Sequence, residues 1–164
     1  MSHVELRAAE ARDLPMIFRA ERDYMTQIEP GQLPRWLAAV DRNLELWVAN
    51  LGRTLIAVLD GTDAGYAMWT REGTRATLIT IHVLPRHRRH GIGSTLLSAV
   101  ITAAARDGAT ALELGVHVGN GARALYEQAG FTHVRDDDDY LFYVLPLASR
   151  GQPRPWPASS RGSA

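Results

Sequence analysis

The chain has 164 residues, a formal net charge of zero and no cysteine, and 46% of its residues are hydrophobic. This length and composition are typical of one globular domain with a sizeable core, and the missing cysteines exclude disulfides, thiol nucleophiles and thiolate metal sites. The balanced charge argues against binding nucleic acid through a wide basic face.

The two ends of the chain suggest how it is organised. The first residues lack the pattern of a signal peptide, and no apolar run reaches membrane-spanning length, so we expect a cytoplasmic protein with no membrane partner. From residue 148 the sequence is rich in Ser, Pro, Arg and Gly around Trp156. We therefore expect one domain over residues 1–147 and a flexible tail over residues 148–164, with packing of Trp156 on a second subunit as the alternative.

The N-terminal part predicts one strand and two helices. We expect a strand at residues 4–8 and a helix that begins near Asp13 and ends near residue 25. A Pro-Gly loop over residues 26–32 leads into a second helix at residues 33–51. The apolar side chains of this second helix recur every three or four residues, which predicts one buried face. They are Leu33, Trp36, Leu37, Val40, Leu44, Trp47, Val48 and Leu51.

Three strands follow in a meander. Residues 53–59 and 65–70 are rich in apolar residues between turns, which is typical of strands. Residues 77–84 form a third and more deeply buried strand. Pro85 ends it because proline cannot donate a hydrogen bond to a sheet.

A basic glycine turn then leads directly into a helix. The turn, RHRRHGIG, covers residues 86–93, and an apolar helical pattern runs from Ser94 to the stop at Gly108. The first amides of a helix have no partner within it, and the helix dipole favours an anion. The two glycines allow close approach, and Arg88 and Arg89 add positive charge. The turn therefore predicts a site for phosphate or pyrophosphate.

The remaining elements are a strand at residues 111–118, a short helix at 122–129, and strands at 131–135 and 140–147. Four aspartates, residues 136–139, join the last two strands. Consecutive acids do not converge on one ion, so we interpret this run as a solvated hairpin turn and expect no metal site.

Two common phosphate-binding motifs do not fit the turn. Walker A needs Gly-Lys-Ser/Thr, and a dinucleotide fingerprint needs a third glycine where this chain has Leu96. Glu113 has about the spacing of a ribose-binding acid, but it lies inside a predicted strand. A nucleotide-binding protein remains an alternative.

Two motifs carry a resemblance to a known family. The first is Val83-Leu84-Pro85 followed by Arg88-x-x-Gly91-x-Gly93; the second is Asn120, Ala124-Leu125-Tyr126-Glu127 and Gly130-Phe131. With the order of predicted elements over residues 4–147, they resemble the GCN5-related N-acetyltransferases. The span from Asn120 to Tyr126 is one residue shorter than is usual in the family.

The resemblance implies an α/β fold with a mixed, mostly antiparallel central sheet of about six or seven strands flanked by helices. It also implies acetyl-CoA, with its pyrophosphate on the turn amides and its pantetheine beside the central strand. That strand is expected to part from the strand at 111–118, and Gly115 and Gly119 fit such a departure. The expected cofactor-binding residues are Ile81, His82, Val83, Arg88, Arg89, His90, Gly91, Ile92, Gly93, Ser94, Asn120 and Tyr126. For Asn120, a simple helix-capping role stays equally open.

The resemblance further implies a proton donor and a proton acceptor. Tyr126 is the expected general acid, which protonates the departing thiolate. The positions that often carry a base in the family hold Thr77 and Ile79 here, so we expect His117 or Glu21 to serve instead. As a base, His82 ranks lower because alternation along the strand puts it on the face opposite Thr77 and Ile79. A water molecule held by Thr77 is a further option. The expected acceptor-binding residues are Tyr24, Glu29, Trp69 and Thr77.

These expectations describe an N-acetyltransferase that moves an acetyl group from acetyl-CoA to a primary amine. Because no cysteine can carry the acetyl group, we expect direct attack in a ternary complex. We expect a small-molecule amine in preference to a protein, and Glu21 and Glu29 would favour a cationic one. The alternative is a non-catalytic acyl-CoA sensor of the same fold. Homodimers are common in the family.

Overall fold

The structure is a computed structural model that describes residues 3–148. The tail expected over residues 148–164 lies outside the described residues, apart from Ala148. The strands are β1 (Val4–Ala8), β2 (Thr54–Leu59), β3 (Thr62–Glu72), β4 (Arg75–Val83), β5 (Ala111–His117), β6 (Thr132–Asp137) and β7 (Tyr140–Pro146). The α-helices are α1 (Leu14–Ile28), α2 (Leu33–Ala38), α3 (Val40–Ala49), α4 (Ile92–Arg106) and α5 (Arg123–Gln128).

All seven strands form one sheet in the order β1-β2-β3-β4-β5-β7-β6. Only β4 and β5 run parallel; every other neighbouring pair is antiparallel. The predicted mixed, mostly antiparallel sheet with flanking helices is therefore confirmed. None of the helices within residues 3–148 is long and apolar enough to cross a membrane.

Helices cover both faces of the sheet, because strand side chains alternate between the faces. On one face, α1 and α3 bury Ile17 and Trp47 against Ile56, Tyr66 and Met68 of β2 and β3. The other face packs against α4 and α5. The buried side chains there include Leu96, Leu97, Val100, Leu112, Leu114, Tyr126 and Tyr143.

The central strand β4 contains a β-bulge. Met68 pairs with Thr80 and Trp69 pairs with Leu78, so Ile79 is the extra residue. Ile79 packs in the cluster on the α1 face, and the side chain of Thr80 also reaches α1. The bulge therefore turns two successive side chains of β4 toward the same helix.

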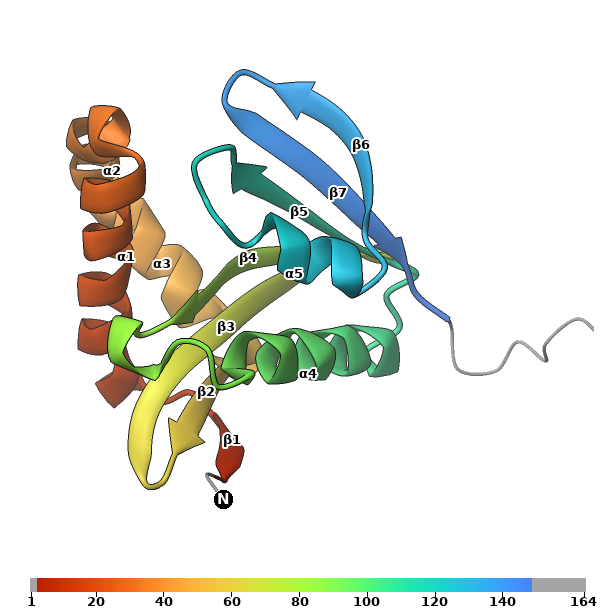
Figure 1. The fold of residues 1–164 in the computed structure, drawn as a ribbon, viewed down its shortest axis with the longest axis horizontal. Helices are drawn as coiled ribbons and strands as arrows, with labels where there is room; N and C mark the ends of the chain where they lie inside the picture. Colours follow the sequence, from red (N-terminus) through yellow and green to blue (C-terminus); the bar gives the residue numbers. More distant parts are fainter. Residues whose placement is uncertain (1–2, 149–164) are drawn as a thin grey trace, which may run out of the picture.

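Strands β4 and β5 pair over a short distance and then separate. Their register covers Arg75–Thr77 against Ala111–Glu113, whereas β4 continues to Val83 and β5 to His117. Figure 1 shows the two strands diverging from a common end, with α5 in front of the opening and α1 across its mouth. Beyond Thr77, the edge of β4 that faces β5 has no strand partner among the described residues.

Gly115 has a different role from the one that the sequence suggested. It stays paired with Phe142 of β7, and a Cβ at Gly115 would lie 2.9 Å from the Phe142 ring. Its missing side chain makes room for this ring, and the separation of the strands begins earlier, after Glu113.

The predicted helix over residues 33–51 was wrong in extent and in burial. The chain forms two helices, α2 and α3, interrupted at Ala39, whose N–H bonds the carbonyl of Trp36. This break ends the single apolar stripe. Trp47 is 3% exposed, but Leu37, Leu44 and Val48 remain at the surface. The loop expected over residues 26–32 is shorter than predicted, because α1 continues to Ile28 and a short 3-10 turn, η2 (Pro30–Gln32), follows.

Candidate active site

The basic turn after β4 presents a row of backbone amides that have no partner among residues 3–148. A 3-10 turn, η4 (Pro85–His87), follows β4, and α4 begins at Ile92. None of the N–H groups over residues 89–94 donates a hydrogen bond to a described residue, and the first amide bonded into α4 is that of Thr95. These are the amides for which the sequence predicted a phosphate ligand.

Two residues of the turn have left-handed backbone conformations. Arg89 has φ 67° and Gly91 has φ 74°. Successive N–H groups in turns of this kind point into a shared concavity that binds anions. A Cβ on Gly91 would meet no heavy atom within 4 Å, which leaves open space beside the amides. The geometry fits a diphosphate, stabilised by the dipole of the 15-residue helix α4.

Tyr126 lies on α5, beside this turn. A Cβ on Gly93 would lie 3.5 Å from the side chain of Leu125, so α5 packs against the start of α4. The ring of Tyr126 is 5% exposed and packs edge-on against Phe131 at 5.9 Å. No described residue bonds its hydroxyl, and none of the described side chains has a fully buried polar atom without a partner, so this hydroxyl reaches solvent. Burial raises the pKa of Tyr126 to about 12, which keeps the phenol protonated at neutral pH.

Glu21 of α1 lies against the bulge of β4. Its Oε1 accepts hydrogen bonds from the hydroxyl of Thr80 at 2.6 Å and from that of Tyr66 at 2.8 Å. Burial raises the pKa of Glu21, and the two donors act in the opposite direction. A carboxylate with a raised pKa, fixed by two hydroxyls, is suited to accept a proton. The contributions of Tyr66 and Thr80 were not predicted, since their separation from Glu21 in sequence gives no local signal.

His117 ends β5 and is held in a particular tautomer. Its Nδ1 lies 3.0 Å from the backbone N of Gly119 and accepts that N–H. A neutral ring must then carry its proton on Nε2, which makes Nε2 a donor. The ring also packs edge-on against Tyr140 at 5.5 Å. In this arrangement His117 is better placed to donate a hydrogen bond than to act as a base.

A second carboxylate, Glu29, lies where α1 meets the C-terminal strands. It is 7% exposed and accepts a hydrogen bond from the hydroxyl of Tyr140. Burial and the charge of Glu29 raise the pKa of Tyr24. The hydroxyl of Tyr24 accepts a hydrogen bond from Asn120 at 3.4 Å, and Asn120 Oδ1 accepts the N–H of Ala122 at 3.0 Å. Asn120 thus ties α1 to the turn before α5. It does not cap α5, because the N-cap residue is Ala122 and no described side chain bonds the first amides of the helix.

Two cavities lie along β7 on the side away from α5. One, of about 440 Å³, is lined by Thr77, Glu113, Gly115 and Phe142. The other, of about 750 Å³, is lined by Phe142 and Tyr140, by Met25 and Trp36, and by residues 137–139 of the aspartate run. Phe142 lines both, so together they define the candidate acceptor side. The sequence indicated Thr77 here but not Phe142 or Tyr140, whose alternation along β7 was the available signal.

The other predicted site residues fall in different places. Trp69 is 4% exposed in the core on the α4 face, where Arg53 stacks on its ring, so the structure does not bring it to the acceptor side. The side chains of Ile81 and Val83 pack toward the same core. His82 points to the α1 face and stacks on Tyr66 at 5.8 Å. Ile79 packs on the same face, so the prediction that His82 lies opposite Ile79 was wrong, because the bulge shifts the alternation of β4 by one residue. Burial and then the charge of Arg88 lower the pKa of His82 to about 4.

Comparison with known proteins places the chain in a family. The model of the acetyltransferase (GNAT) family matches residues 14–131. A curated relative, the [ribosomal protein bS18]-alanine N-acetyltransferase of Haemophilus influenzae, is 37% identical over 86 residues, which are 52% of this chain and 58% of that protein. The match thus spans little more than half of that relative's length.

Solved structures share the fold. The PaiA N-acetyltransferase of Thermoplasma acidophilum, in complex with coenzyme A, superposes with a TM-score of 0.75 at 19% identity, over 88% of this chain and 99% of that one. The ribosomal-protein-S18-alanine N-acetyltransferase of Escherichia coli gives 0.65 at 23% identity, over 93% and 100%. The family model covers well over half of the residues, from α1 to the end of α5. The chain belongs to the acetyltransferase (GNAT) family.

Proposed function

We propose that this protein is an acetyl-CoA-dependent N-acetyltransferase that acts on a primary amine. The observation that carries the proposal is the row of amides over residues 89–94, which bond no described residue. They follow a strand whose edge toward β5 has no strand partner after Thr77 within the described part of the chain. We call the amides over residues 89–94 the anion cradle. An anion cradle that directly follows an open strand edge suits a ligand with a diphosphate at one end and amide groups along its arm.

The residues present fit acetyl-CoA. The amides of the turn would hold its pyrophosphate, and the free edge of β4 over residues 78–83 would pair with its pantetheine amides. Bound there, acetyl-CoA would supply the acetyl thioester. The relatives PaiA of Thermoplasma acidophilum and yncA of Salmonella typhimurium were crystallised with coenzyme A and with acetyl-CoA, which supports this choice of ligand.

Tyr126 and Glu21 are the proposed proton donor and acceptor. The phenol of Tyr126 keeps its proton at neutral pH and has a hydroxyl free to donate to a departing sulfur. Glu21, fixed by Thr80 and Tyr66 at the bulge of β4, would take the proton that the amine must lose. His117 would orient groups by donating from Nε2.

The acceptor amine would approach from the β7 side, past Phe142 and Tyr140. Because the chain has no cysteine, transfer by direct attack of the amine in a ternary complex is the simplest mechanism. Two acceptor classes remain in view. The buried carboxylate of Glu29 favours a small cationic amine, whereas the likeness to a bS18-alanine N-acetyltransferase favours the N-terminal α-amine of a protein.

Two measurements test the function. Calorimetry with acetyl-CoA, CoA, ATP and NAD should show binding of the first two alone; binding of ATP or NAD in their place would point to a nucleotide-binding protein. Release of free thiol from acetyl-CoA should then rise with spermidine or with a peptide that begins with alanine, and the preferred acceptor identifies the class. Tight binding of acetyl-CoA without transfer to any amine of a broad panel would favour the alternative, a non-catalytic acyl-CoA sensor.

A further inference from the structure

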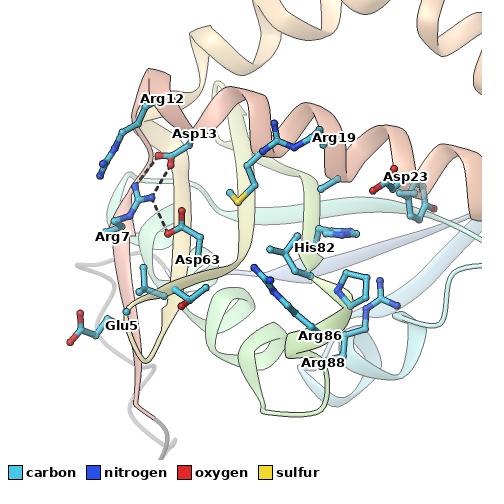
Figure 2. A pocket seen from close by; sticks show the side chains of 18 of the residues that line it. Glu5, Arg7, Arg12, Asp13, Arg19, Asp23, Asp63, His82, Arg86 and Arg88 are labelled. Carbon is cyan, nitrogen blue, oxygen red and sulfur yellow. Dashed lines mark hydrogen bonds and ion pairs between the residues drawn. The ribbon is translucent and has the colours of Figure 1, made fainter.

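A groove distinct from the turn amides runs along the α1 face of the sheet. It has a volume of about 990 Å³ and lies between α1, the edge formed by β1 to β3, and the η4 turn. Of the residues whose amides form the anion cradle, 89–94, none lines it. Figure 2 shows charged side chains entering this groove from all three of its walls.

The charges at its β1 end are neutralised within the protein. Arg7 makes ion pairs with Asp13 at 2.7 Å and with Asp63 at 3.2 Å, and Arg12 pairs with Glu10 at 2.7 Å. Asp13 is 4% exposed and also accepts the N–H of Glu10. This end of the groove is therefore a closed structural cluster.

The end near η4 is different, because its arginines form no ion pair with a carboxylate in the part of the chain that the structure describes. Arg19, Arg86 and Arg88 line the groove, and none of them lies within 4 Å of a carboxylate of residues 3–148. Arg88 donates to the carbonyl of Val83, and Arg86 donates to His87, through Nε in each case, so the ends of both guanidinium groups stay available. Figure 2 shows Arg19 extending from α1, and Arg86 and Arg88 rising from the turn.

The surroundings of these arginines offer little to offset their charge. Asp23 of α1 also lines the groove but makes no ion pair with a residue of the described range 3–148, and apolar Met16, Ala20 and Leu84 line the groove too. Burial and then the charge of Arg88 lower the pKa of His82, whereas the charge of Asp23 acts in the opposite direction. Three guanidinium groups facing one concave, partly apolar space repel one another, and an anion relieves that repulsion.

We propose that this groove binds a small polyanion, with phosphate or carboxylate groups held by Arg19, Arg86 and Arg88, and that it does so independently of the turn amides. The side chain of Arg88, expected from the sequence to contact the cofactor, is here assigned to the groove. Guanidinium groups suit both chemistries because their planar donors pair with two oxygens of a carboxylate or phosphate at once. The groove would then be a second ligand site on the face of the sheet opposite α4 and α5.

The test measures binding of citrate and of inorganic phosphate by calorimetry, to protein first saturated with CoA. Saturation fills the turn, so the remaining heat reports on the groove. Arg19→Ala should weaken binding of the anion about tenfold, the usual effect of losing a charge-assisted hydrogen bond. The affinity for CoA should stay within about twofold, because Arg19 lies on α1 and not on the turn. Arg42→Ala is the matched control, since Arg42 is an exposed arginine of α3 outside the groove.

Three results would overturn the proposal. Loss of anion binding on saturation with CoA would place the anion on the turn itself. An unchanged affinity in Arg19→Ala, or an equal loss in Arg42→Ala, would remove the arginine cluster as the cause. Failure of both anions to bind the saturated protein would leave the groove without the assigned ligand. None of these results bears on acetyl transfer, because the readout is anion binding alone.

Discussion

The replacement Tyr126→Phe tests the proposed proton donor with the least damage to the fold. The variant keeps the ring that packs on Phe131 and Tyr143, and it removes a hydroxyl that no described residue bonds. The free energy of unfolding should therefore change by less than about 0.5 kcal/mol, since no intramolecular hydrogen bond is lost. A large fall in kcat would then reflect the loss of the hydroxyl from the acetyl-transfer step and not a loss of folded protein.

The size of the effect follows from the pKa of the phenol. Burial raises the pKa of Tyr126 to about 12, whereas an ordinary thiol has a pKa of about 8.5. Complete transfer of the proton to the thiolate would be uphill by about 3.5 pKa units, or ~5 kcal/mol at 1.36 kcal/mol per unit. The phenol is thus expected to stabilise the developing charge by a hydrogen bond, which contributes about 1.5–3 kcal/mol for a charged partner. Tyr126→Phe should lower kcat about 10- to 100-fold.

The assay is thiol release from acetyl-CoA at saturating amine, with the affinity for acetyl-CoA measured separately by calorimetry. That affinity should be nearly unchanged, and the shape of the pH profile between about pH 6 and 9 should be kept, because a phenol with a pKa of about 12 does not titrate there. Tyr143→Phe is the control: Tyr143 is 1% exposed and its hydroxyl donates to Glu127, on the same side of the sheet. A kcat for Tyr126→Phe within twofold of the wild-type value across this pH range would refute the reasoning.

Three further substitutions probe the base, the turn and the sheet. Glu21→Gln should lower kcat at least about tenfold. Because burial raises the pKa of Glu21, the folded protein holds the proton of this carboxyl more tightly than the unfolded chain does. The free energy of unfolding of the wild type should therefore fall relative to that of the variant as the pH rises above about 4.5. Urea denaturation curves that give the same difference between the two proteins from pH 4 to 8 would contradict this. Gly91→Glu should weaken acetyl-CoA binding at least about tenfold, because the new carboxylate repels the diphosphate. Gly73→Glu, at an equally open left-handed position with φ 58°, should leave the affinity unchanged. Equal losses of affinity in calorimetry would show a general effect on folding. Gly65→Ala should lower the free energy of unfolding by about 2 kcal/mol or more in chemical denaturation, because its Cβ would lie 2.6 Å from the backbone oxygen of His82. Gly52→Ala, whose Cβ would meet no atom within 4 Å, should lower it far less. Similar losses in the two variants would argue against the clash.

The anion cradle and the order of elements were readable from the sequence because both depend on neighbours in the chain. A strand that ends at proline, two glycines and a helix start lie within one short stretch, so the unpaired amides over residues 89–94 follow from local hydrogen-bonding rules. The same holds for the hairpin turns: Asp60, Gly61 and Asp138 all have positive φ at the positions where turns were predicted.

Burial was less readable wherever it depended on the orientation of a helix. The apolar spacing over residues 33–51 predicted one buried face, but the break at Ala39 has no strong local signal, and Val48 is 56% exposed. Trp69 looked like a pocket residue, yet it alternates with Met68 along β3 and therefore packs in the core on the α4 face. In both cases the deciding contacts are with elements distant in sequence.

The sequence by itself determined the family motifs, the turn that is suited to bind a pyrophosphate, and Tyr126 as the candidate proton donor. Only the tertiary structure decided which carboxylate is fixed beside the bulge, because Glu21 meets Thr80 and Tyr66 across 59 and 45 positions of the chain. It also decided the tautomer of His117 and the gathering of Arg19 with Arg86 and Arg88 in one groove. Local rules act through the backbone over a few residues, whereas a site needs side chains whose proximity comes from packing the whole sheet against its helices.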